Sequence, residues 1–149
     1  MSDADRPLPE HTVPQGVDDA TVEAVGLVSE ALEHIERARG HLYSFHQLIG
    51  GGDLKLGEAV DKLRASGHDD VADRIERDII GRNVLDGRWT FQVVEEFDDT
   101  YWGPFREMER SVRDGLVHGR RHLFEAAMKE DRRTHGHPQH TARPETGPA

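Results

Sequence analysis

Histidine is the residue type in this sequence that is best suited to chemistry, because its imidazole ring binds metal ions and titrates near neutral pH. The chain has ten histidines and no cysteine. Most of the histidines fall into three groups: His34, His41 and His46; His118 and His122; and His135, His137 and His140. This layout indicates a metal site or a pH-sensing role, and the helices that carry the histidines decide which of them can act together.

His34 and His41 share one face of a predicted helix, because seven residues at about 100° each return to within about 20° of the starting direction. They are about 10 Å apart along the helix axis, whereas zinc lies about 2.1 Å from each histidine nitrogen that binds it. One ion therefore cannot bind both. Each histidine either contributes to a separate site that other helices complete, or lies at the edge of the apolar face with ordinary hydrogen bonds.

His46 and Arg39 lie in the centre of the apolar stripe of the same helix. A polar side chain at such a position must be hydrogen-bonded or paired with a charge. The available partners are the carboxylates of one acidic cluster: Glu95, Glu96, Asp98 and Asp99. We therefore predict a buried network of Arg39, His46 and carboxylates that sets the register of the helices.

The alternative for these groups is a cavity that binds a small molecule or a divalent metal, the one cofactor that the sequence suggests. Its candidate residues are His34, His41, His46, Glu95, Glu96 and Asp99. Carboxylate-bridged metal sites in helical bundles use Glu-x-x-His motifs, and this chain has none. The sequence alone does not choose between the network and the cavity.

His118 and His122 have the four-residue spacing of a metal-binding pair on a predicted helix, and Glu125 follows one turn later. These three residues are a second candidate metal site. They point away from the apolar centre of that helix, which favours a solvated face or a contact with a second subunit. The chain lacks the His-Glu-x-x-His motif of zinc proteases, and the tail histidines can chelate an ion adventitiously.

An aromatic cluster follows a loop in the second half of the chain. Its members are Trp89, Phe91, Phe97, Tyr101 and Trp102. We expect either the densest part of the core or an aromatic pocket or subunit interface, since tryptophan and tyrosine favour both. No phosphate-binding loop or nucleophile motif is present, so the sequence names no catalytic residue.

The composition excludes several classes of partner. The formal net charge is −10, and 32% of the residues are charged. A field of this sign repels phosphate backbones and anionic lipids, so we expect no nucleic-acid or membrane partner. The N-terminus lacks the basic and apolar parts of a secretory signal, and without cysteine there are no disulfides. A cytoplasmic location is therefore expected.

Hydrophobic periodicity predicts two long helices with shorter ones between them. The long helices span 18–49 and 104–133, and the short ones lie around 56–63, 71–79 and 90–101. Gly50, Gly51 and Gly52 are expected to end the first helix, and Thr90 to cap a later one. Residues 83–91 form either a hairpin or an irregular turn.

Glycines punctuate the last predicted helix. Gly103-Pro104 is expected to break or kink the chain before it. Gly115 and Gly119 lie near its apolar stripe, and they suggest that another backbone approaches closely there.

The predicted fold is all-α, an antiparallel helical bundle in which two long helices frame the shorter ones. Residues 18–133 form a single domain by length. Residues 1–17 contain three prolines among polar residues and read as a disordered arm, and residues 134–149 read as a disordered tail.

The stretch from His41 to Leu48, continued through Arg82 to Trp102, resembles small uncharacterised bacterial all-helical proteins of unassigned function. The resemblance implies a helical fold and carries over no catalytic residue.

Two functions follow from these patterns. The first is a non-catalytic helical bundle that acts through protein–protein contacts or as a homo-oligomer. The second is a bundle that binds a metal or small molecule through a site of histidines and carboxylates.

Overall fold

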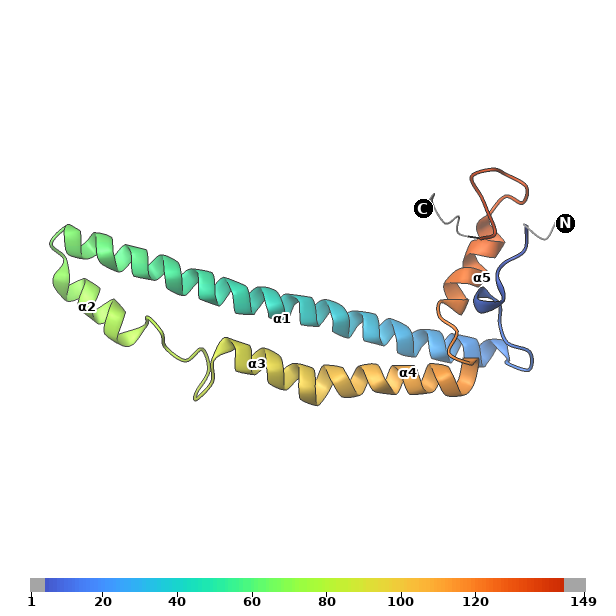
Figure 1. Cartoon of the computed structure of the whole chain (residues 1–149), viewed down its shortest axis with the longest axis horizontal. Coiled ribbons are helices and arrows are strands. Elements are labelled where there is room, and N and C mark those ends of the chain that lie inside the picture. Colours follow the sequence, from blue (N-terminus) through green and yellow to red (C-terminus); the bar gives the residue numbers. More distant parts are fainter. Residues whose placement is uncertain (1–4, 144–149) are drawn as a thin grey trace, which may run out of the picture. The chain divides into compact units, whose positions relative to one another are not determined.

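The computed structural model describes residues 5–143, and all of its regular structure is helical (Figure 1). The elements are a short 3-10 helix η2 (Pro9–His11), α1 (Asp19–Ala65), α2 (Asp69–Asp78), α3 (Thr90–Phe97), a π-helix η3 (Asp98–Trp102), α4 (Gly103–Val117) and α5 (Leu123–Arg132). The residues that the structure describes contain no strand. The predicted all-α class is confirmed.

Helix α1 continues through the glycine triplet, so the prediction that Gly50–Gly52 ends it is wrong. Glycine costs about 1 kcal/mol relative to alanine at each helical position. The apolar heptad pattern nevertheless resumes at once, with Leu56 seven residues after Ile49. Packing of the apolar stripe before and after the triplet outweighs the low helix propensity of the three glycines. The helix predicted around 56–63 is therefore the last part of α1.

The chain forms two compact units, and α1 and α4 each contribute to both. Unit 1 contains the residues up to Glu33 and those from Phe105 onward, whereas unit 2 is His34–Pro104.

Unit 2 is a helical hairpin, in which the chain runs out along α1 and returns through α2 and α3 (Figure 1). The reversal lies at Gly67, whose φ of +81° favours glycine. Arg64 fastens the returning chain, since its guanidinium donates hydrogen bonds to Asp73 and Glu76 of α2. The helix predicted around 71–79 is confirmed as α2.

The segment 83–91 contains a tight turn and no hairpin of strands. Leu85 and Arg88 form one isolated antiparallel bridge, in which the Arg88 N–H lies 3.0 Å from the Leu85 oxygen. Gly87 supports the turn with a φ of +68°. The sequence left open whether residues 83–91 form a hairpin or a turn, and the structure shows a turn.

Gly103-Pro104 does not break the helix. The π-helix η3 instead joins α3 to α4 without interruption, and the Gly103 N–H donates to the Asp98 oxygen five residues earlier. A Cβ atom on Gly103 would lie 3.0 Å from that same oxygen. Close approach to this backbone oxygen therefore favours glycine at this position.

The predicted last helix, 104–133, is wrong as a single element. Helix α4 ends at Val117, and α5 begins at Leu123. The intervening residues include His118, Gly119 and His122, with φ values of 58°, 73° and 56°. Such left-handed backbone is incompatible with a continuous right-handed helix.

The approach of another backbone expected at Gly115 and Gly119 is not observed, and the atom nearest to a Cβ built on Gly119 is Asp114 Oδ1 at 2.9 Å. No atom lies within 4 Å of a Cβ built on Gly115. Gly119 instead ends α4, because its N–H donates to the Arg113 oxygen at 3.0 Å.

Unit 1 has a small apolar core. Its buried residues are Val22, Val25, Val117 and Leu123, and Val13, Val17 and Val112 pack against them. Residues 5–17, for which the sequence predicts a disordered arm, contain η2 and join this core through Val13 and Val17. Residues 1–4 and 144–149 lie outside the described part of the chain.

Candidate functional site

Arg39 and Asp98 form a bidentate ion pair between α1 and η3. Arg39 Nε donates to Asp98 Oδ1 at 2.7 Å, and a terminal nitrogen donates to Oδ2 at 3.0 Å. The two side chains are 27% and 19% exposed. The hydrogen bond from Arg39, with a smaller one from the Tyr43 hydroxyl, lowers the pKa of Asp98. The predicted pairing of Arg39 with the acidic cluster is confirmed.

Two aromatic rings lie against the Arg39 guanidinium. Its central carbon lies 3.9 Å from the centroid of the Trp102 ring and 4.8 Å from that of Tyr43. Trp102 Nε1 donates to Glu36 at 3.0 Å. The sequence reasoning missed Glu36 and Tyr43 as partners, although their spacing of three and four residues from Arg39 on α1 is a recognisable signal.

His46 is bonded to a hydroxyl group, so the prediction of a carboxylate partner for it is wrong. Its Nδ1 lies 2.7 Å from Thr90 Oγ1. The start of α3 lies opposite His46, and the acidic cluster begins five residues after Thr90, more than one helical turn later. Thr90 is the first residue of α3 and its predicted role as the helix cap is also wrong, because Trp89 precedes it as the cap residue.

Three polar residues follow each other at intervals of seven on the packed side of α1: Arg39, His46 and Asp53. Each has a polar partner on the returning chain, and the partners run in the opposite direction. They are Asp98, Thr90 and the backbone N–H of Gly81, which lies 2.9 Å from Asp53. Specific polar pairs at such positions set the register of helices, so the predicted register function extends to Asp53.

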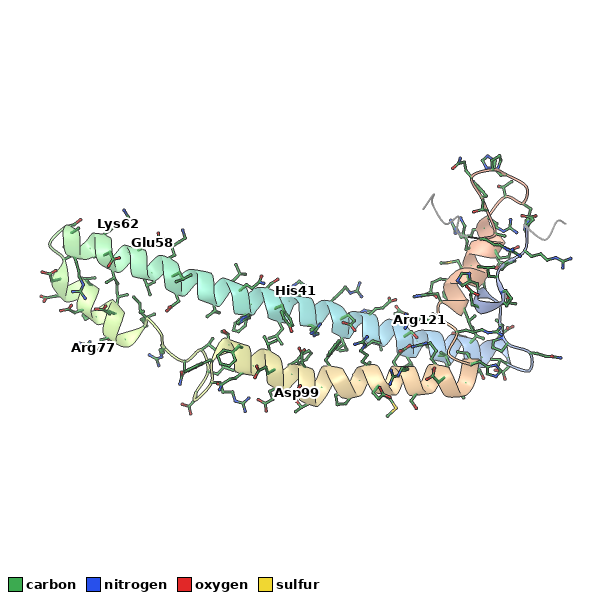
Figure 2. The ribbon with its side chains drawn as sticks, in the orientation of Figure 1. His41, Glu58, Lys62, Arg77, Asp99 and Arg121 are labelled. Carbon is green, nitrogen blue, oxygen red and sulfur yellow. The ribbon has the colours of Figure 1, made fainter. Side chains whose placement is uncertain are left out.

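The other predicted ligands do not gather. Glu95, Glu96 and Asp99 are exposed, and Glu96 pairs with Arg88. His41 is exposed on α1, whereas Asp99 belongs to η3 (Figure 2). Across residues 5–143, no group of three or more histidines and carboxylates is arranged to hold a metal ion.

The second candidate metal site lacks the helix on which it was predicted. His118 and His122 lie in the connection between α4 and α5, so their four-residue spacing does not place them on one helical face. His122 has an acidic neighbour in Glu125, with Nδ1 and Oε2 4.0 Å apart.

The aromatic cluster is largely on the surface. Trp89, Phe91 and Tyr101 are 57%, 42% and 48% exposed. Trp89 and Phe91 meet edge to face with ring centroids 5.4 Å apart, and Phe97 and Tyr101 at 5.6 Å. The expectation that this cluster forms the densest part of the core is therefore wrong.

Unit 1 contains a buried ion pair that sequence reasoning missed. Arg113 Nε donates to Glu109 at 3.0 Å, Ser29 donates to the same carboxylate at 2.9 Å, and Arg113 also donates to the Gly119 oxygen. Burial alone would raise the pKa of Glu109, but these hydrogen bonds lower it overall. The signal in the sequence is the four-residue Glu–Arg spacing.

Arg133 joins the two ends of the described chain. Its side chain is fully buried, and it donates to Glu130 at 2.6 Å and to Asp5 at 2.7 Å. These two hydrogen bonds raise the pKa of Arg133. His135 lies 3.8 Å from Asp5. This cluster was missed because its members lie in or beside segments that read as disordered.

The tail histidines make local contacts. His140 Nδ1 accepts a hydrogen bond from the Thr134 N–H at 2.9 Å, and the rings of His137 and His140 lie 4.4 Å apart.

About half of the apolar side chains of unit 2 are exposed, and most of the others are half-buried. Only three of the apolar residues between 34 and 104 are buried, namely Val60, Ala72 and Val94. Eleven large apolar residues of the same unit are more than a third exposed: Tyr43, Phe45, Leu48, Ile49, Leu54, Val71, Ile79, Leu85, Trp89, Phe91 and Tyr101. The surface of unit 2 is therefore the candidate functional site, as an interface.

Between residues 5 and 143, no helix combines the length and the apolar character that crossing a bilayer requires. Comparison of the chain with protein families, curated proteins and solved structures finds no match.

Proposed function

We propose that this protein is a non-catalytic assembly protein that acts through protein–protein contacts, first of all by self-association. The observation that carries the proposal is the imbalance in unit 2, where three apolar residues are buried and eleven large ones are more than a third exposed. A helical hairpin gains most of its stability by burying an apolar face. A hairpin with so thin a core therefore gains from a further surface that covers it.

The size of the exposed apolar surface supports this function. The eleven residues are between 37% and 75% exposed, so together they present on the order of 1,000 Å² of surface. A stable interface needs about 800 Å² from each partner. The total exposed apolar area is thus comparable to what one interface requires, and it is spread over more than one face of unit 2.

The polar clusters support a non-catalytic role. Every buried polar side-chain atom in the described chain has a hydrogen-bond partner. Arg39, His46 and Asp53 are each engaged across the hairpin. A general acid or base needs a proton site that is free to reach a substrate, and these groups are instead committed to holding helices together.

Sedimentation velocity and light scattering of the full chain across micromolar concentrations test the proposal. The expected result is a species of at least twice the chain mass of 16.8 kDa that dissociates on dilution. A strictly monomeric chain throughout that range would remove self-association as the function.

A further inference from the structure

Helix α1 carries a second heptad pattern beside its packed side. We call it the outer stripe, and its residues in unit 2 are His34, Ala38, His41, Phe45, Leu48, Gly52, Lys55, Ala59 and Lys62. All of them except Ala59 are exposed. Repeats of three and four residues along one helix are the pattern of a helix–helix seam. Within unit 2, no other helix covers the outer stripe.

The outer stripe consists of two rows with different sizes of side chain. The first row has Ala38, Phe45, Gly52 and Ala59 at intervals of seven, and it is small except at Phe45. The second row has the larger residues His34, His41, Leu48, Lys55 and Lys62. When two such helices pair in antiparallel orientation, the small row of one faces the large row of the other, which allows close packing.

The outer stripe also differs in charge from the rest of the protein. The chain has a net charge of −10, and α1 carries Glu36, Asp53, Glu58 and Asp61 within residues 34–62. None of these carboxylates lies in the outer stripe, whose charged members are lysines. An ordinary solvated face of so acidic a protein would carry carboxylates.

We propose that two copies of this chain pair in antiparallel orientation through their outer stripes, with Ala38 against the partner's Leu48 and His41 against the partner's Phe45. In this register His34 meets the partner's Gly52, so a small residue faces a large one at the pairs on either side of the central His41–Phe45 contacts. The proposal rests on self-association as the function and adds the surface and the orientation. Two hairpins joined in this way make a four-helix assembly.

The charge distribution along α1 supports a second copy as the occupant. Residues 19–36 carry five carboxylates and no lysine or arginine, whereas residues 37–65 carry five lysines and arginines and three carboxylates. With Ala38 opposite the partner's Leu48, the outer-stripe lysines Lys55 and Lys62 lie opposite positions 31 and 24 of the partner, within its acidic segment 19–36. Parallel pairing would place like charges together, which costs free energy.

Two leucines of α1 provide a matched test of the surface. Leu48 lies in the outer stripe and Leu54 outside it, and they are 74% and 75% exposed. Six residues place them about 120° apart around the helix. We expect Leu48→Glu to raise the dissociation constant of the dimer about tenfold or more, because a charge is buried at the seam, and Leu54→Glu to leave it unchanged. Circular dichroism checks that both variants stay helical.

Crosslinking tests the orientation, and the absence of cysteine makes introduced thiols unambiguous. We expect a mixture of Ala38→Cys and Leu48→Cys chains to form a mixed disulfide dimer, detected by intact mass. Ala38→Cys alone should crosslink poorly, since its two copies would be about 15 Å apart along the antiparallel helices, beyond the reach of a disulfide.

The outcomes separate the two proposals. A monomeric wild-type chain would overturn both. A wild-type dimer that Leu48→Glu does not weaken, or that crosslinks through Ala38→Cys alone, would overturn the antiparallel seam and leave self-association standing.

Discussion

Arg39 is a polar residue in the apolar stripe of α1, and several contacts meet at its side chain. It lies in a stripe otherwise suited to leucine, and it is paired with Asp98 and stacked on Trp102. Removing one partner of a half-buried ion pair leaves the other charge partly desolvated without its compensation. The same side chain also provides packing through its apolar stem. Arg39 therefore contributes to stability in three ways: it sets the register of the helices, it pairs with a charge, and it packs against its neighbours.

We expect Arg39→Ala to lower the free energy of unfolding by about 1–3 kcal/mol, because Asp98 loses its partner and Trp102 loses its stacked cation. Urea denaturation followed by circular dichroism measures the change. Arg37→Ala is the control, since Arg37 is exposed on the same helix, and it should change the stability by less than about 0.5 kcal/mol. Equal effects of the two substitutions would contradict the role assigned to Arg39.

The Asp98 carboxylate also predicts a pH dependence. Its pKa is lowered in the folded state, chiefly by the hydrogen bond from Arg39. The resulting stability is fully present above the ordinary value of 3.8 and is lost as the pH falls through the lowered value. Melting temperatures measured from neutral pH down to about 2 should fall less steeply for Asp98→Asn than for the wild type. Parallel curves for the two proteins would refute this assignment.

At the scale of elements, the sequence predicts helices well where the apolar repeat is regular and fails where the backbone geometry decides. The repeat located α2 and the packed side of α1. It did not show that α1 passes through Gly50–Gly52, because a local helix-ending signal competes there with packing on both sides. The apolar repeat also did not predict the end of α4, because histidine is not a residue type that indicates the positive φ found at His118 and His122.

Two glycine substitutions should have opposite effects. No atom lies within 4 Å of a Cβ on Gly51, so Gly51→Ala should raise the free energy of unfolding by about 1 kcal/mol through helix propensity. Gly103→Ala should lower it, because the new Cβ meets the Asp98 oxygen in the π-helix. Thermal and urea denaturation measure both changes. Stabilisation by Gly103→Ala would show that the π-helix relaxes without cost.

At the scale of the whole molecule, the candidate site was only partly predictable. The apolar stripe interrupted by Arg39 and His46 indicated a polar network, and the acidic cluster supplied the correct partner for Arg39. The Thr90 hydroxyl was not predictable, because it depends on which residue of the returning chain lies opposite His46. The exposure of the aromatic cluster was not predictable either, since aromatic residues are equally typical of cores and interfaces.

Arg133 should hold the first described residues in place. We expect Arg133→Ala to speed hydrogen exchange in residues 5–17, because Asp5 loses its hydrogen bonds. Arg132→Ala is the control, since Arg132 is the exposed neighbour. Hydrogen-exchange mass spectrometry resolves this segment from α1. Unchanged exchange in Arg133→Ala would show that the Val13 and Val17 contacts suffice on their own.

The glycine triplet of α1 has a consequence for the handling of the protein by proteases. Proteases need several residues in extended form, and cleavage is usually concentrated in exposed loops and termini. Gly50–Gly52 form a solvent-exposed helical turn without side chains to brace it, so transient unwinding begins there more readily than elsewhere in α1. Limited digestion should therefore nick this helix in its middle, and the outer stripe, when covered by a second copy, should slow the cut.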